Sequence, residues 1–202
     1  MPLVGTKANA GAFGLGWSAS SVEVLGGMVL ITPTSIASTG TGNSSSIGAN
    51  GSVTFSSCAT LSLNGVFTSE YDNYMISMRW TSSGTSNADL RLRTSGTDAT
   101  TNYTRQFLYV DSTTVQGGRA ATDYLVRAYA YGTQRAGVSI YLFGPNLAQP
   151  TAGRTVVVDD YLSASIYEFA GTHSTASSYD GFSFIFGGPT GTGLVSVYGL
   201  GG

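Results

Sequence analysis

The sequence predicts an all-β fold: an antiparallel β-sandwich, jelly-roll-like, with an extended N-terminal arm. About ten short runs alternate apolar with small polar residues and are separated by Gly, Ser and Asn turn residues. These runs are rich in Val, Ile, Tyr, Phe and Thr, which favour strands. No segment repeats its apolar residues every 3.6 positions over three turns, as an amphipathic helix does, and no fixed internal period indicates a propeller or solenoid. We therefore expect two packed sheets over residues 27–202.

The strands are expected in order from this alternation. The first expected strand is 28–34, which ends near Pro33. The Ser-, Gly- and Asn-rich stretch 35–51 is expected to be a loop, and so is 94–101. The run 88–93 alternates strictly, with its two leucines inward and its two arginines outward. The other expected strands are 52–63, 74–80, 103–110, 123–131, 138–143, 155–159, 164–169, 182–186 and 194–198.

The first 26 residues differ from the rest because they are rich in Gly and Ala. Phe13, Leu15 and Trp17 alternate with small residues there, as in an extended strand that shows one face to a partner. We expect residues 1–26 to be an anchoring arm that binds a neighbouring subunit through these three side chains. The alternative is a leader that folds onto its own sheet.

Composition excludes several classes of protein. Charged residues make up 10% of the chain, against about 25% in an ordinary domain, and the formal net charge is −2. Without a basic cluster there is no electrostatic basis for binding nucleic acid. The 42% of hydrophobic residues excludes disorder. No apolar run is long enough to insert in a membrane, and no signal peptide is visible, so synthesis in a cytoplasm is expected.

The residues that usually carry chemistry are few. Cys58 is the only cysteine, which excludes an internal disulfide and a thiolate metal site, and its strand-like surroundings predict a small buried side chain. His173 is the only histidine and lies in Gly, Thr and Ser surroundings typical of a loop. Asp159 and Asp160 are the only adjacent carboxylates. On a strand they point to opposite faces, although a turn there would let them bind Ca²⁺. We predict no catalytic residue, no metal site and no cofactor.

Tyrosine and tryptophan suggest a different kind of site. Twelve tyrosines is a high number for 202 residues, and many of them follow the strands at alternate positions. Rings with outward hydroxyls favour subunit contacts or a platform for sugars. A lectin-like module would use Trp80 and Tyr131 for glycan contact. A glycan-degrading enzyme would instead require a cleft with paired acids.

Several short passages resemble tailed-bacteriophage virion proteins that pair a short Gly-rich N-terminal segment with a β-sandwich. The passages are 61–76 (LSLNGVFTSEYDNYMI), 90–93 (LRLR), 147–150 (LAQP), 178–185 (SYDGFSFI) and 191–199 (GTGLVSVYG). The stretch 5–19 (GTKANAGAFGLGWSA) is similar to the leader segments of phage tail and fibre proteins. The resemblance covers residues ~30–200 and implies no catalytic residues.

This resemblance implies a virion structural protein, made in the host cytoplasm and expected to be a homotrimer. The expected role is a fibre- or spike-type tail component that is anchored to other virion proteins by its arm and contacts the host surface, including its glycans. Two alternatives stay open: a capsid decoration or head-fibre protein, and a carbohydrate-binding lectin-like module. Low charge favours close packing of identical subunits, because little like-charge repulsion opposes it.

Overall fold

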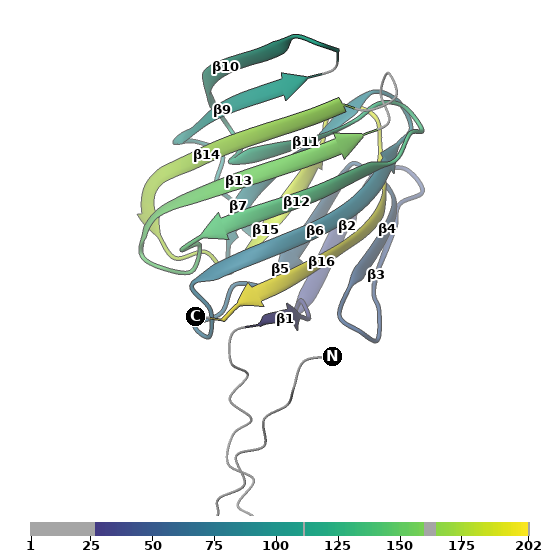
Figure 1. Cartoon of the computed structure of the whole chain (residues 1–202). Helices are drawn as coiled ribbons and strands as arrows, with labels where there is room; N and C mark the ends of the chain where they lie inside the picture. The colour runs from purple at the N-terminus through teal and green to yellow at the C-terminus, as the bar shows by residue number, and fades with distance from the viewer. Residues whose placement is uncertain (1–26, 111, 160–164, 202) are drawn as a thin grey trace, which may run out of the picture.

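The computed structural model describes residues 27–110, 112–159 and 165–201, and these residues form strands and no helix (Figure 1). The all-β prediction is confirmed. The strands are β1 (Met28–Ile31), β2 (Ser35–Thr39), β3 (Ser44–Ile47), β4 (Val53–Cys58), β5 (Thr60–Asn64), β6 (Asn73–Ser82), β7 (Ser86–Thr94), β8 (Thr97–Asp98), β9 (Tyr103–Val110), β10 (Val115–Thr122), β11 (Val126–Ala130), β12 (Ala136–Phe143), β13 (Gln149–Asp159), β14 (Ser165–Ser177), β15 (Gly181–Phe186) and β16 (Gly191–Leu200).

Two antiparallel sheets face each other as a sandwich. The larger sheet has the order β10-β9-β14-β13-β12-β6-β16-β4-β3, with β1 also paired to β16, and the smaller has the order β11-β7-β15-β5-β2, with β8 paired to β7. Consecutive strands β4 and β5, β6 and β7, β11 and β12, and β15 and β16 lie in opposite sheets. The run β4-β16-β6-β12 therefore faces the run β5-β15-β7-β11, which is a jelly-roll arrangement of eight strands.

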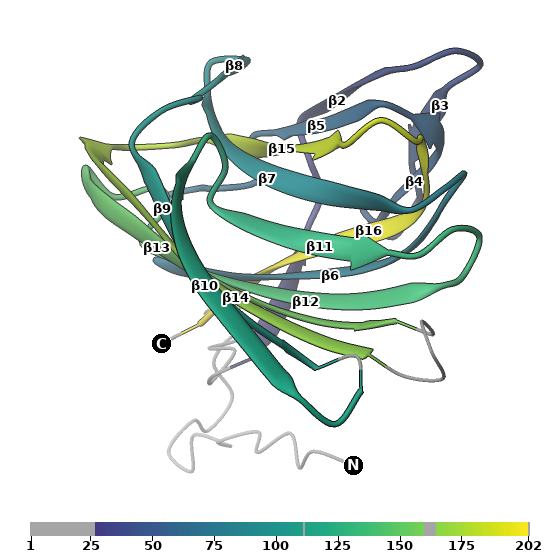
Figure 2. The ribbon, with the colours of Figure 1, turned by 90° about the horizontal axis from the view of Figure 1, so that it is seen from above.

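Two further hairpins extend the larger sheet beyond this jelly roll. The pair β9–β10 comes between β7 and β11 in the chain, the pair β13–β14 follows β12, and β9 pairs with β14. All four strands continue the larger sheet on the side where the smaller sheet ends at β11 (Figures 1 and 2). The larger sheet therefore carries an inner surface that the smaller sheet covers only in part.

The core lies between the sheets and is formed by the inward residues of each alternating strand. In β7 the predicted inward residues Leu90 and Leu92 are fully buried, while Arg91 and Arg93 lie on the opposite face. Cys58 is a buried free thiol, as predicted. Each buried aliphatic or aromatic side chain of this kind contributes roughly 1.5–3 kcal/mol by leaving water.

The prediction of a loop over 35–51 is wrong, because β2 and β3 lie within this range. Hydroxyl side chains join these strands to their neighbours: Thr39 Oγ1 lies 2.7 Å from Thr60 Oγ1, and Ser46 Oγ lies 2.8 Å from Thr54 Oγ1. Cross-strand hydroxyl pairs of this kind stabilise a sheet without apolar side chains. The Ser- and Thr-rich composition that suggests a loop is here the composition of strands.

Two other strands were not expected. The short β8 lies in the expected loop 94–101, where Arg93 and Thr94 of β7 pair with it. Strand β10 contains Gly117 and Gly118, which indicate a turn but pair with Leu108 and Phe107 of β9. The side chains of Leu108 and Phe107 on β9 come within 2.9 Å of the positions that Cβ atoms on Gly117 and Gly118 would occupy. Side chains of the partner strand thus stabilise a strand whose own sequence is weak.

The predicted anchoring residues Phe13, Leu15 and Trp17, like the whole predicted arm, lie outside the described residues, and β1 begins at Met28. Within the ranges that are described, no helix is long and apolar enough to cross a membrane.

Candidate functional site

The strongest candidate site is a cavity of about 210 Å³ where β9, β14 and the end of β11 come together. We call it the aromatic pocket. Seven of the described residues line it; six of them carry aromatic rings, and the seventh is an arginine. The lining residues are Arg105, Phe107, Tyr109, Tyr129, Tyr131, Tyr167 and Phe169.

Strand register determines which side chains meet in the pocket. Phe107 and Tyr109 of β9 lie directly opposite Phe169 and Tyr167 of β14. Because residues two apart on a strand point to the same face, all four rings project from the inner face of the larger sheet. Tyr129 reaches the same place from the edge strand β11 of the smaller sheet.

The rings pack against one another to form a continuous surface. Ring centroids lie 5.9 Å apart for Phe107 and Phe169 and 5.5 Å apart for Tyr109 and Tyr167. The Tyr129 ring closes the group, at 5.0 Å from Tyr167 and 5.9 Å from Phe169. Tyr167 and Phe169 are buried and form the floor, whereas Phe107, Tyr109 and Tyr129 are half-buried. Part of this aromatic surface is therefore open to solvent.

Arg105 places a positive charge against these rings. Its guanidinium carbon lies 4.9 Å from the ring centroid of Phe107, 5.5 Å from that of Tyr124 and 5.8 Å from that of Phe169. Such cation–π contacts stabilise the charge by about 0.5–2 kcal/mol each. The Nε atom of Arg105 is buried and has no hydrogen-bond partner.

Arg127 also lies at the Tyr124 ring, but it has a carboxylate partner. Its guanidinium donates to both carboxylate oxygens of Asp89, over 2.5 and 2.8 Å, and lies 4.4 Å from the Tyr124 ring centroid. Burial raises the pKa of the Asp89 carboxyl, and the hydrogen bonds and charge of Arg127 oppose that rise. Burial opposes the charged form of Arg127, but the hydrogen bonds and charge of Asp89 raise its pKa, so the arginine stays charged. This pair is internally neutralised, whereas no ion pair among residues 27–110, 112–159 and 165–201 involves Arg105.

The phenols of Tyr124 and Tyr167 stay protonated at neutral pH. Burial raises the pKa of Tyr124 to about 12, and the charge of Arg127 opposes this rise. Burial also raises the pKa of Tyr167, and Coulombic repulsion from the neighbouring Tyr131 and Asp159 adds to it. Neutral phenols both donate and accept hydrogen bonds, so the pocket offers polar contacts beside its ring faces.

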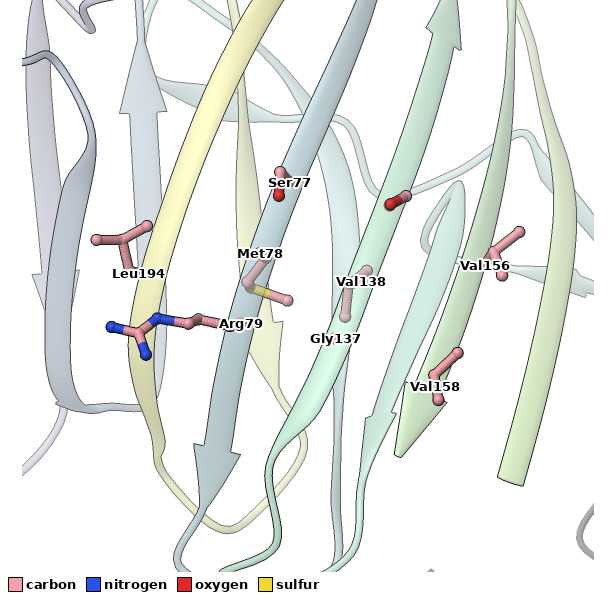
Figure 3. A pocket seen from close by; sticks show the side chains of 9 residues that line it. Ser77, Met78, Arg79, Gly137, Val138, Val156, Val158 and Leu194 are labelled. Carbon is pink, nitrogen blue, oxygen red and sulfur yellow. The ribbon is translucent and has the colours of Figure 1, made fainter. Parts of the chain in front are cut away.

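A larger but shallower hollow, of about 410 Å³, lies on the outer face of the larger sheet (Figure 3). It forms because Gly137 has no side chain between Arg79 on β6 and Val158 on β13. Its floor is strand backbone, and Arg79 is its one charged lining residue. A single exposed cation beside aliphatic side chains supplies no acid–base pair and suits packing against another protein surface.

The hollow continues into a row of exposed aliphatic side chains, which we call the aliphatic row. Val115, Val110, Ile166 and Val158 lie side by side on β10, β9, β14 and β13. Val115, Ile166 and Val158 are each at least half exposed. Aliphatic side chains aligned in this way on an outer sheet face are typical of a protein–protein contact.

The structure separates the two residues predicted for glycan contact. The prediction that Trp80 contacts a glycan is wrong. Trp80 is 1% exposed and packs against Phe186, with ring centroids 5.3 Å apart. Its parity on β6 points it into the core, so no sugar reaches its ring. Tyr131, which follows β11, lines the aromatic pocket and stays a predicted contact.

The prediction that His173 lies in a loop is wrong. His173 lies within β14 and is buried. Its Nε2 donates to the carbonyl oxygen of Thr101 over 3.0 Å, and its Nδ1 accepts from the Tyr179 hydroxyl over 3.0 Å. Both ring nitrogens are thus bound within the protein, and in the neutral imidazole the proton lies on Nε2, because the carbonyl of Thr101 can only accept. Burial lowers the pKa of this imidazole.

The possible Ca²⁺ site is only partly described. Asp159 is buried at the end of β13, while Asp160 lies outside the described residues. No group of three or more His, Cys, Asp or Glu side chains that could hold a metal ion occurs in the described part of the chain.

Sequence reasoning missed that the rings converge. Phe107 and Tyr109 alternate on one strand and Tyr129 and Tyr131 on another, but nothing local indicates that these strands meet. One signal was available: Arg105 shares its inward parity with Phe107, and an arginine on an inward face is unusual.

No protein-family model and no curated protein sequence matches this chain. Among solved structures, the binding domain of botulinum neurotoxin serotype G is a weak match, with 10% sequence identity and a TM-score of 0.27. The match covers 87% of this chain and 43% of that chain, so this chain spans less than half of the neurotoxin domain. A likeness of this size carries no argument about function.

Proposed function

We propose that this chain is a structural protein of a phage virion whose β-sandwich binds a saccharide of the host surface in the aromatic pocket. The observation that carries the proposal is the continuous, partly open ring surface of Phe107, Tyr109 and Tyr129 over a floor of Tyr167 and Phe169. A pyranose presents an apolar C–H face that packs on an aromatic ring, because ring faces carry negative charge density. Its hydroxyls then find donors and acceptors in the tyrosine hydroxyls.

The lining favours binding over hydrolysis. Hydrolysis of a glycosidic bond needs two carboxyl groups ~5–10 Å apart. Among the residues that the structure describes, the seven that line the aromatic pocket include no carboxylate and no histidine. The nearby Asp89 is bound by Arg127 through both of its oxygens. A noncatalytic binding role is what this chemistry supports.

The virion part of the proposal rests on the sequence passages that resemble phage proteins. The segment 1–26 would anchor the protein to other virion proteins through Phe13, Leu15 and Trp17, and the protein would be a homotrimer. A protein that lacks residues 1–26 should still fold and bind saccharide but should not join the particle. Normal incorporation of this truncated protein would contradict the anchoring role.

Saccharide binding is tested by isothermal titration with host surface polysaccharides and by a glycan array. Tyr131→Ala should weaken binding about tenfold, or ~1.4 kcal/mol, because one stacking and hydrogen-bonding side chain is lost. The control is Tyr141→Ala, since Tyr141 lies on the outer face of β12 and is exposed. Equal loss in the two variants, or no binding of any saccharide by the unmodified protein, would contradict the proposal.

The aliphatic row supports a second candidate, a capsid decoration or head-fibre protein packed against other shell proteins. Val158→Asp would place a charge in the row and should reduce incorporation into particles while leaving saccharide binding unchanged. Particle imaging separates the two roles, because a tail component is present in a handful of copies and a decoration protein in tens to hundreds.

A further inference from the structure

Arg105 is a partly buried cation that pairs with no carboxylate in the described part of the chain. Arg91, Arg93, Arg127 and Arg154 each form an ion pair with an acidic side chain, and none of the ion pairs among the described residues involves Arg105. The other described arginines, at 79, 119 and 135, are exposed to water. An arginine taken out of water normally has an anionic partner. The pocket therefore carries a positive charge that no described acidic side chain neutralises.

We infer that the aromatic pocket takes an acidic saccharide unit, whose carboxylate binds the Arg105 guanidinium while its ring stacks on Phe107 and the neighbouring tyrosines. This inference rests on the proposed function, and it specifies the class of sugar. A guanidinium presents its N–H donors in a planar fork that matches the two oxygens of a carboxylate. The surrounding rings supply no oxygen acceptor of comparable strength.

The contacts of Arg105 leave it suited to this role. Phe107, Tyr124 and Phe169 hold the guanidinium from their ring faces, which fixes its position before any ligand arrives. Its Nε is buried and has no hydrogen-bond partner. A pre-positioned cation loses little conformational entropy on binding, which favours affinity.

The two ends of the pocket differ in chemistry. Arg105, Phe107 and Tyr109 follow one another on the inner face of β9, with the Arg105 guanidinium 4.9 Å from the Phe107 ring centroid and that centroid 6.1 Å from the Tyr109 ring centroid. At the Tyr109 end, Tyr167 stands opposite on β14, and the buried Asp159 acts on it electrostatically. The carboxylate of the ligand therefore belongs at the Arg105 end and its hydroxyls at the tyrosine end.

The size of the pocket limits the ligand to one sugar unit at a time. Its volume of about 210 Å³ is below the ~300–1,000 Å³ typical of sites for drug-sized ligands. One pyranose ring with its carboxylate fits this space, and the rest of a polysaccharide would extend into solvent.

The test compares acidic sugars with neutral counterparts of the same ring. The probes are the methyl glycosides of glucuronic acid and glucose, those of galacturonic acid and galactose, and N-acetylneuraminic acid and its methyl ester, each titrated into the full chain. We expect at least one acidic sugar to bind tenfold or more tightly than its counterpart. In Arg105→Met this preference should fall to about onefold, because the acidic sugar loses its charge partner while its neutral counterpart has no carboxylate to lose one.

Arg119→Met is the matched control, because Arg119 lies on the next strand with its side chain on the outer face of the hairpin. It should keep the preference of the unmodified protein, and urea unfolding of both variants shows whether each is folded. Equal binding of acidic and neutral sugars, or equal loss of both in Arg105→Met, would overturn the inference and leave the proposed function standing. Absence of binding by all six probes and by every glycan on an array would overturn both.

Discussion

The carbonyl oxygen of Leu125 lies 1.7 Å from the position that a Cβ atom on Gly171 would occupy. Gly171 is directly opposite Arg105 in the pairing of β14 with β9. The absence of a side chain at 171 thus lets the backbone that leads into β11 lie against the larger sheet beside Arg105. This contact places Tyr129 and Tyr131 where they complete the aromatic pocket.

Gly171→Ala should therefore destabilise the protein by about 3 kcal/mol or more, because the added methyl group meets backbone that cannot move without shifting β11. Gly137→Ala is the matched control: it lies in the same sheet, and the nearest atom to its Cβ would be 4.0 Å away. It should change stability by less than ~0.5 kcal/mol. Urea unfolding midpoints measure both, and equal midpoints for the two variants would contradict the close contact.

A buried ion pair on the smaller sheet should contribute more to stability than an exposed one on the larger. Arg93 Nη1 donates to Asp98 over 2.8 Å and to the hydroxyls of Ser62 and Ser183, and both charged side chains are largely buried. Asp98→Ala should cost about 2 kcal/mol, since it leaves the Arg93 charge without its carboxylate.

The matched comparison for that pair is Arg154 with Glu168, whose side chains are 55% and 41% exposed. Glu168→Ala should cost less than ~1 kcal/mol, because water screens the pair. Thermal unfolding of the two variants gives the difference, and a larger loss for Glu168→Ala than for Asp98→Ala would show that the pairs are ranked wrongly.

Stability should fall as the pH drops below about 6.5, the ordinary pKa of histidine. Burial lowers the pKa of His173 in the folded protein, so the unfolded chain takes up a proton first and is favoured. Between the ordinary and the lowered pKa the loss approaches ~1.4 kcal/mol per pH unit. Because His173 is the only histidine, His173→Gln should remove this dependence between pH 7 and the range where carboxylates titrate. An unchanged slope in that variant would assign the effect to other groups.

The Cys58 thiol should react with a thiol reagent only after unfolding. The side chain is buried in the core, and burial raises the pKa of the thiol, so little thiolate forms at neutral pH. Labelling with a chromogenic disulfide should be negligible for the native protein and should reach one thiol per chain in urea. Rapid labelling of the native protein would show that the β4 end of the core opens to solvent.

The alternation of apolar and polar residues predicted the fold class because both sheets have one buried face. Leu90 and Leu92 are examples in which period-2 spacing alone predicted burial correctly. The same reasoning failed for β2 and β3, whose stability comes from hydroxyl pairs such as Ser46 with Thr54 and not from apolar side chains.

The pocket could not be predicted as a site, because it depends on long-range register. Phe107 and Phe169 are 62 positions apart and meet only because β9 and β14 pair where two added hairpins extend the sheet. Trp80 shows the opposite error: a tryptophan is expected to stack on sugar rings, yet Trp80 lies on the inward face of β6 and is 1% exposed.

The most direct test of the central claim is an NMR titration of the tyrosine ring signals with the acidic and neutral sugar probes. If the aromatic pocket is the binding site, shifts should be confined to Tyr109, Tyr129, Tyr131 and Tyr167, while Tyr141 and Tyr198 on the outer face of the larger sheet stay unchanged. Shifts centred on Tyr141 and Tyr198, or no shift with any saccharide, would contradict the account.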